Sequence, residues 1–188
     1  METIKKIVVI GPESTGKSTL CQKLAAHYNT LWVPEYAREY LEKNGPEYNY
    51  DDLLTIAKGQ IELEEKIGNG QLATGNLPSA FNFQPSTLFI DTDMYVMTVW
   101  AEFVFNKCHN WILNRIAERK YDLYLLCDVD LPWFEDPLRE YPDKKVREKL
   151  YLFYKDLMVN QSVPWCNISG DYQERFEKAV KFIESSFT

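Results

Sequence analysis

The chain has 188 residues, 28 of them acidic and 21 basic, which gives a formal net charge of −7. That length suits a single domain, 1–188, and the acidic balance argues against a nucleic-acid partner, because such proteins carry basic patches. The sequence contains no recognisable secretory signal and no run of roughly 18 apolar residues, which argues against a membrane partner. The cysteines match neither zinc spacing nor a secreted disulfide framework, so we expect reduced thiols and a cytoplasmic protein; they are Cys21, Cys108, Cys127 and Cys166.

Short apolar runs alternate with longer helical patterns along the whole chain. The runs show no polar alternation, which is typical of strands in a parallel sheet that is covered on both faces. We therefore expect an α/β fold of three layers, with helices on both sides of a five-stranded parallel sheet. The predicted strands are 7–10, 31–33, 88–90, 123–127 and 165–168.

The first predicted strand leads into Gly-Pro-Glu-Ser-Thr-Gly-Lys-Ser at 11–18, which matches a phosphate-binding loop between a strand and a helix. Two glycines let the backbone curl with its amides inward, and the helix N-terminus adds partial positive charge. Lys17 is expected to reach the β- and γ-phosphates, and the Ser18 hydroxyl to ligate magnesium. The motif predicts ATP and Mg²⁺ as cofactors, with ATP bound by Gly11, Glu13, Ser14, Thr15, Gly16, Lys17, Ser18 and Thr19.

Acidic residues follow the third predicted strand, at the sheet edge where parallel sheets bind ligands. Asp91 is placed like a carboxylate that serves the metal, and Asp93 could orient an acceptor hydroxyl. Spacing does not tell which of the two is the catalytic base, and Asp93 could instead be the N-cap of the next helix. Ser169 and Gly170 follow the fifth strand and are expected to contact ATP.

Glu35 and Arg38 follow the second predicted strand and are candidates for the acceptor site. Glu35 could also be a first-turn acid that the helix dipole stabilises. Arg38 could clamp a phosphate, or pair with Glu35 or Glu42 on the surface.

A segment with several prolines and four cations, about 132–147, suits a lid that closes over ATP. We expect Arg139 to reach the transition state and Arg147 to support it, whereas surface ion pairs explain Lys144 and Lys145 equally well. A second long segment, about 68–87, reads as a turn-rich loop that is partly ordered by Phe81 and Phe83.

In combination the motifs resemble the ribosylnicotinamide kinase domain of NadR-type proteins, over nearly the whole chain and in the same order. The resemblance implies a P-loop kinase fold with a mobile lid, and ATP-dependent phosphorylation of the 5′-hydroxyl of nicotinamide riboside to nicotinamide mononucleotide. It also implies that Arg139 belongs to the lid and that six residues face the nucleoside: Glu35, Tyr36, Arg38, Gln60, Asp91 and Asp93. The predicted catalytic set is Lys17, Asp91, Asp93 and Arg139. The segments that carry it are 11–20, 34–41, 57–60, 89–93, 121–126 and 132–139.

Two features depart from the family pattern. The lid motif usually reads Asp-Gly-Leu-Arg, whereas 136–139 reads Asp-Pro-Leu-Arg, and the chain leaves no room for a nucleotidyltransferase or DNA-binding part. We therefore expect the reaction to stop at the mononucleotide. The alternatives are a kinase for another nucleoside or small metabolite, and an ATP-binding or ATPase module without a small-molecule acceptor; a homo-oligomer is compatible with each.

Overall fold

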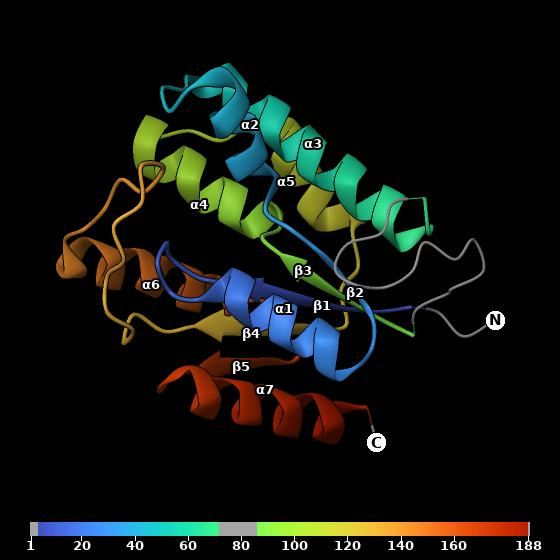
Figure 1. Cartoon of the computed structure of the whole chain (residues 1–188). Helices are drawn as coiled ribbons and strands as arrows, with labels where there is room; N and C mark the ends of the chain where they lie inside the picture. Colours follow the sequence, from blue (N-terminus) through green and yellow to red (C-terminus); the bar gives the residue numbers. More distant parts are fainter. Residues whose placement is uncertain (1–3, 72–85, 188) are drawn as a thin grey trace.

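The computed structural model describes residues 4–71 and 86–187, in which five strands form one parallel sheet (Figure 1). The strands lie in the spatial order β2-β3-β1-β4-β5. Each falls on a predicted apolar run, so the five-stranded parallel sheet is confirmed. The strands are β1 (Lys5–Ile10), β2 (Leu31–Val33), β3 (Thr87–Asp91), β4 (Leu123–Cys127) and β5 (Trp165–Ile168).

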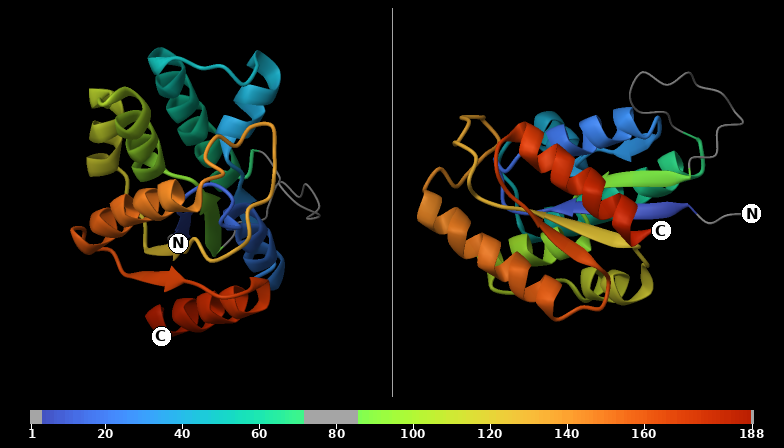
Figure 2. Two further views of the ribbon diagram at one scale, coloured as in Figure 1. Left: turned by 90° about the vertical axis from the view of Figure 1, so that its left-hand side faces the viewer. Right: turned by 90° about the horizontal axis from the view of Figure 1, so that it is seen from below.

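Helices cover both faces of the sheet, so the predicted three-layer P-loop kinase fold is also confirmed (Figures 1 and 2). Within the described residues α1 and α7 pack on one face, and α3, α4 and α6 pack on the other. The helices are α1 (Lys17–His27), α2 (Tyr36–Asn44), α3 (Tyr50–Gly68), α4 (Met94–Phe105), α5 (Asn110–Glu118), α6 (Lys144–Val159) and α7 (Tyr172–Ser186).

The central strand β1 is buried from both sides. Ile7 and Val9 point toward the layer of α1 and α7, whereas Val8 and Ile10 point toward the layer of α3, α4 and α6, because successive strand residues alternate between faces. A third apolar cluster joins α2, α3, α4 and α5 beside the sheet. The end of β1 is therefore held by packing on every side before the chain enters the phosphate loop.

Capping side chains fix the starts of two helices. Asn49 caps α3: its side chain accepts hydrogen bonds from the backbone N–H groups of Asp51 and Asp52, while the Asp52 carboxylate accepts from Asn49 N–H. The irregular segment predicted at 132–147 ends at Asp143, which caps α6 by accepting from Lys145 N–H. We call residues 128–143 the lid segment.

The other expectations for the chain are covered only in part by the described residues. Helix α3 extends to Gly68, so the long loop begins where expected, but residues 72–85, with Phe81 and Phe83, lie outside the described part. All four cysteines carry free thiols. Among the helices that the structure describes, none combines the length and apolar character that a membrane span needs.

The carboxyl ends of the parallel strands meet at one edge of the sheet. The loop after β1 and the lid segment after β4 lie at this edge, on the left in Figure 1. The left panel of Figure 2 looks onto the edge and shows the lid segment rising toward α2 before it returns to α6. The residues that follow the five strands, which are far apart in the sequence, are thereby brought to one edge.

Candidate active site

Two glycines shape the phosphate loop. Gly11 has a φ of 140°, and a Cβ there would lie 2.7 Å from the Cys127 carbonyl oxygen, so no side chain fits at this position. Gly16 has a φ of 76°, and its Cβ would meet the Leu131 side chain at 3.0 Å. A side chain at Gly16 would therefore strain the backbone and push against Leu131. The Thr15 hydroxyl donates to the Pro12 carbonyl oxygen at 2.7 Å and closes the loop internally.

Lys17, Ser18 and Asp91 form the polar base of the site. Lys17 is buried and its Nζ donates to the Pro12 carbonyl oxygen at 3.1 Å, while the Ser18 hydroxyl donates to Asp91 Oδ2 at 2.5 Å. Asp91 is fully buried, and its Oδ1 has no hydrogen-bond partner among the described atoms. Burial, and then the negative charge of Glu35, raise the pKa of the Asp91 carboxyl above its usual range.

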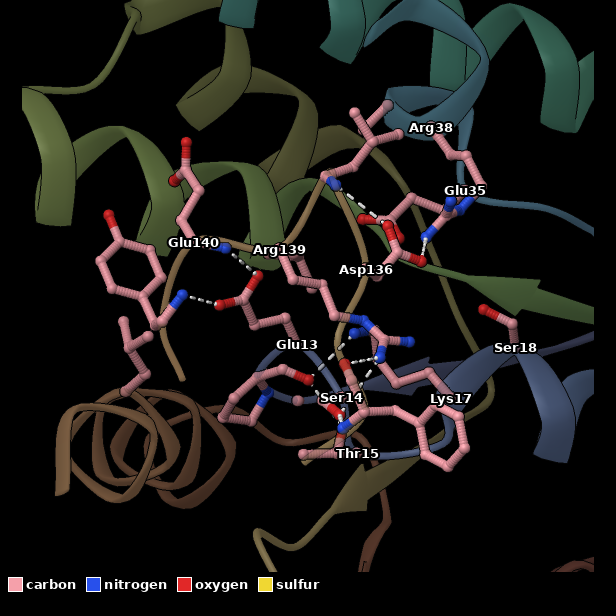
Figure 3. Close-up of a pocket in the computed structure, with 18 of the residues that line it drawn as sticks. Glu13, Ser14, Thr15, Lys17, Ser18, Glu35, Arg38, Asp136, Arg139 and Glu140 are labelled. Atoms are coloured by element: carbon pink, nitrogen blue, oxygen red, sulfur yellow. Dashed lines mark hydrogen bonds and ion pairs between the residues drawn. The ribbon is translucent and has the colours of Figure 1, made fainter. Parts of the chain in front are cut away.

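A cavity of about 470 Å³ opens above the loop, between α2, α4, α6 and the lid segment (Figure 3). This volume lies within the range of small-molecule sites, about 300 to 1,000 Å³. The structure brings eleven of the predicted site residues to its wall: Gly11, Glu13, Ser14, Thr15, Gly16, Lys17, Ser18, Thr19, Glu35, Arg38 and Arg139. Asp91 reaches the cavity through its bond to Ser18.

The lid segment is fastened to the phosphate loop by two side chains of that loop. The Glu13 carboxylate accepts from the backbone N–H groups of Glu140, at 3.1 Å, and of Tyr141. The Ser14 hydroxyl accepts from Phe134 N–H at 3.0 Å and from the Arg139 guanidinium at 3.4 Å, as Figure 3 shows. Burial raises the pKa of Glu13, although the two backbone hydrogen bonds act in the opposite direction. The phosphate loop therefore anchors the lid segment through the side chains of Glu13 and Ser14.

Arg38 connects α2 to the lid segment across the opening. Its guanidinium donates to Asp136 Oδ2 at 2.8 Å and lies 3.6 Å from Glu42 Oε1. Arg38 therefore lines the cavity and also forms one of the predicted surface pairs, that with Glu42, whereas among the described residues it makes no ion pair with Glu35. Glu35 itself occupies the N-cap position of α2, but its side chain makes no capping hydrogen bond and borders the cavity.

Four other predicted contacts lie outside the cavity wall: Tyr36, Gln60, Ser169 and Gly170. Gln60 is buried and links two strand ends, because its amide accepts from Tyr36 N–H at 2.7 Å and donates to the carbonyl oxygens of Pro34 and Asp91 at 3.3 Å. The Tyr36 ring packs so closely on Gly59 that a Cβ there would lie 2.0 Å from it. These two side chains position the start of α2.

Asp93 also lies away from this cavity. Thr92 adopts a φ of 78°, so α4 begins at once and Asp93 becomes its N-cap, accepting from Tyr95 N–H at 2.9 Å. The other carboxylate oxygen accepts from the Tyr124 hydroxyl at 2.8 Å. Burial raises the pKa of Asp93 to about 6. Asp93 borders a separate cavity of about 320 Å³ and does not line the larger one.

Arg175 supports the site from behind, and no motif indicated it. Its buried guanidinium donates to the carbonyl oxygens of Thr15 at 2.9 Å, Asp128 at 3.0 Å and Gly170 at 2.7 Å, and also to Asp130. One side chain of α7 thus joins the phosphate loop to the ends of β4 and β5. The available signal in the sequence was Asp130, an aspartate shortly after β4. The sequence alone does not show that its partner is Arg175.

Arg147, predicted as a second lid cation, is held inside the first turn of α6. It is buried, its guanidinium lies over the Trp133 ring at 5.0 Å, and its Nε and Nη1 have no partner among the described residues. Burial lowers the pKa of Arg147. It does not border the cavity, so Arg139 is the lid cation that reaches the loop.

A phosphate loop after the first strand of a parallel sheet, with a lid segment folded over a shared cavity, defines a P-loop nucleotide-binding protein with a kinase fold. More specifically, the chain belongs to the family whose model is described as an AAA domain, which matches residues 6–175.

Curated relatives confirm the resemblance to NadR-type proteins. The chain is 25% identical over 185 residues to the trifunctional NAD biosynthesis/regulator protein NadR of Escherichia coli (strain K12). It is also 25% identical, over 186 residues, to the protein of the same name in Salmonella typhimurium (strain LT2). Each alignment covers 96% of this chain and 42% of the relative, so the chain spans less than half the length of these relatives.

Solved structures show the same fold. A NadR protein in complex with NR superposes with a TM-score of 0.75 at 23% identity, over 97% of this chain and 50% of that one. A NadR protein in complex with NAD and AMP-PNP gives 0.71 at 22% identity, over 97% and 49%. Thymidylate kinase from Candida albicans gives 0.63 at 16% identity and is covered almost entirely, over 97% and 92%.

Replacing Arg175 tests whether it holds the strand ends together. Arg175→Met should lower the free energy of unfolding by about 3 kcal/mol or more, because three backbone carbonyls and Asp130 lose a buried charged donor. Thermal denaturation measures the loss. Lys178→Met, on the exposed side of the same helix, is the control. A shift in Tm no larger than that of the control would contradict the role of Arg175.

Proposed function

We propose that the protein is an ATP-dependent kinase that phosphorylates the 5′-hydroxyl of nicotinamide riboside and releases nicotinamide mononucleotide and ADP, a step of NAD salvage. The observation that carries the proposal is one cavity whose wall includes both the phosphate loop and Glu35 and Arg38 (Figure 3). Two similar proteins supply further support: one NadR protein is described in complex with NR, and another with AMP-PNP, an ATP analogue.

The donor half of the cavity would hold the triphosphate. Lys17 Nζ rests on a loop carbonyl in this structure and would exchange that weak partner for the β- and γ-phosphates. The loop amides and the N-terminus of α1 add positive potential at the same place. Arg139 lies beside Ser14 at the edge of the loop, where its guanidinium would stabilise the charge on the phosphoryl group in transfer.

Ser18 and Asp91 are suited to hold Mg²⁺. Both offer oxygen atoms, which magnesium prefers, and the buried Asp91 Oδ1 has no partner among the described residues. Magnesium usually takes only one or two protein ligands beside phosphates and water, and this pair meets that need. Bound there, the ion would neutralise phosphate charge; Asp91 would orient Ser18 through the hydrogen bond that it already accepts.

The acceptor half would present the 5′-hydroxyl. The Glu35 carboxylate borders the cavity without a capping bond, so it is free to accept the proton while the oxygen attacks the γ-phosphorus and ADP leaves. Arg38 would keep the lid segment over the acceptor through Asp136. Asp93 and Gln60 would act as positioning residues, because their hydrogen bonds hold α4 and the start of α2. The cytoplasmic location, a homo-oligomer and the lack of a nucleic-acid partner stay predictions.

Purified protein with Mg²⁺ and ATP should release ADP in a coupled assay only when nicotinamide riboside is present. Lys17→Ala should lose most of this turnover, by at least about 100-fold, because the β- and γ-phosphates lose their cation. Equal rates with and without the nucleoside would instead favour an ATPase module, and a preference for another nucleoside in a panel would reassign the acceptor.

The two aspartates around Thr92 should behave differently. Asp91→Asn should lower kcat by about 100-fold or more, since Ser18 and the metal lose a carboxylate. Asp93→Asn should keep kcat within about threefold, because asparagine caps a helix as well as aspartate does. Steady-state kinetics on variants with unchanged Tm measure both. If Asp93→Asn lowered kcat as much as Asp91→Asn does, Asp93 would instead be a catalytic residue.

A further inference from the structure

A second cavity, of about 320 Å³, lies between the start of α4, the end of α5, strand β4 and the connection from α6 to β5. Its volume falls at the lower end of the range of small-molecule sites. Among the described residues, none lines both this cavity and the one above the phosphate loop. The proposed phosphoryl transfer therefore leaves the second cavity unused.

This second cavity has a buried floor and an exposed rim. Asp93, Met94 and Tyr124 line the floor and are only 2% to 3% exposed, whereas Lys120 at the rim is exposed. Both oxygens of the Asp93 carboxylate already accept hydrogen bonds, one from Tyr95 N–H and one from the Tyr124 hydroxyl. A ligand would therefore enter past Lys120 and meet a floor whose one carboxylate is already bonded.

Three cations border the second cavity: Arg115, Arg119 and Lys120. The outer nitrogens of the guanidinium groups are paired, Arg115 Nη2 with Glu118 at 2.5 Å, and Arg119 with two glutamates of α3 at 2.7 and 3.0 Å. The Nε atoms of both arginines are buried and have no hydrogen-bond partner within residues 4–71 and 86–187. Buried donors are nearly always paired in folded proteins, so two free N–H groups at one cavity indicate a ligand that supplies the acceptor.

Three tyrosine rings also border the second cavity. Tyr124 meets Tyr95 and Tyr121 edge to face, with the ring centroids 5.8 Å apart in each pair. The Tyr121 hydroxyl donates to Glu64 at 3.0 Å, and the Tyr124 hydroxyl donates to Asp93 at 2.8 Å. These bonds fix the rings before any ligand enters, and the rings offer faces and edges to a planar group.

We infer that the second cavity is a regulatory site for a small aromatic carboxylate. The carboxylate would accept from the free Nε–H groups of Arg115 and Arg119 and from Lys120, and the aromatic ring would pack on the tyrosines. A single negative charge suits the cavity better than a phosphate dianion, because glutamates already balance both guanidinium groups. The ring would lie toward the floor, since Asp93 repels the anionic end.

Helix α4 connects the second cavity to the proposed active site. Its N-cap Asp93 and its first residue Met94 border the second cavity, whereas Val96, Val99 and Trp100 of the same helix border the cavity above the phosphate loop. A ligand against the start of α4 therefore contacts an element that forms a wall of the active site. The regulation rests on the proposed kinase function, but the binding does not.

Binding is tested with 2-naphthoate and its uncharged amide, 2-naphthamide. The whole chain is titrated by calorimetry with AMP-PNP and Mg²⁺ present, so that the phosphate loop is not available to the probes. We expect a Kd of about 1 mM or lower for 2-naphthoate. The amide should bind about tenfold more weakly, because it lacks the charge-assisted hydrogen bonds. Equal affinities, or no binding of either probe, would overturn the site.

Matched variants locate the bound carboxylate. Arg115→Met should weaken 2-naphthoate binding by about tenfold and Lys120→Met by about threefold, while the affinity for the amide changes less. Lys181→Met, an exposed position of α7 on the opposite face of the sheet, should leave both affinities unchanged. Variants are compared at unchanged Tm, and the exposed Lys120 makes its substitution safe for the fold. Binding that survives both Arg115→Met and Lys120→Met would contradict this location.

The regulatory part is tested by the effect of bound 2-naphthoate on the other cavity. Saturating 2-naphthoate should change the KM for nicotinamide riboside, and the Kd for AMP-PNP measured by calorimetry, by about fivefold; in Arg115→Met neither should change. Constant values while 2-naphthoate is bound would overturn the regulation. If no nucleoside were phosphorylated, the kinase proposal would fail, and the Kd for AMP-PNP would still decide the regulation: a change supports it, and a constant value overturns it.

Discussion

The site depends on one close approach, that of the phosphate loop to the ends of β4 and β5. Gly11 lies so near the Cys127 carbonyl that no side chain fits between them, and Arg175 bonds the loop to both strand ends. Because Glu13 and Ser14 of the same loop hold the lid segment, a change in the conformation of the loop would displace the lid segment as well. The loop is therefore the structural support of the whole cavity and also its phosphate site.

The cavity wall offers different groups to the two molecules that we propose it holds. Lys17, Arg139 and the loop amides lie at the proposed place of the triphosphate, whereas Glu35 and Arg38 border the proposed place of the acceptor. The Arg38–Asp136 pair joins α2 to the lid segment. This arrangement accounts for a chain of net charge −7 that is proposed to bind a polyanion, because local geometry and not overall charge supplies the attraction.

Much of the fold could be predicted because its signals are local. The strands are short apolar runs, and the phosphate loop is a contiguous motif whose glycines suit the positive φ angles of its backbone. The side chains that follow the strands were harder to place, because a residue at the sheet edge can direct its side chain into the cavity or away from it. Asp93 turns away from Asp91 because Thr92 bends the chain and Tyr124 supplies a partner. Arg175 has no local signal, as its acceptors come from distant strand ends.

The measurement that tests the account most directly is a crystal structure with nicotinamide riboside and a non-hydrolysable ATP analogue bound together. In the proposed two-sided site the 5′-oxygen should lie within about 3.5 Å of the γ-phosphorus, close to Glu35. A nucleoside bound outside this cavity, or with its 5′-hydroxyl turned away from the phosphate loop, would contradict the two-sided site.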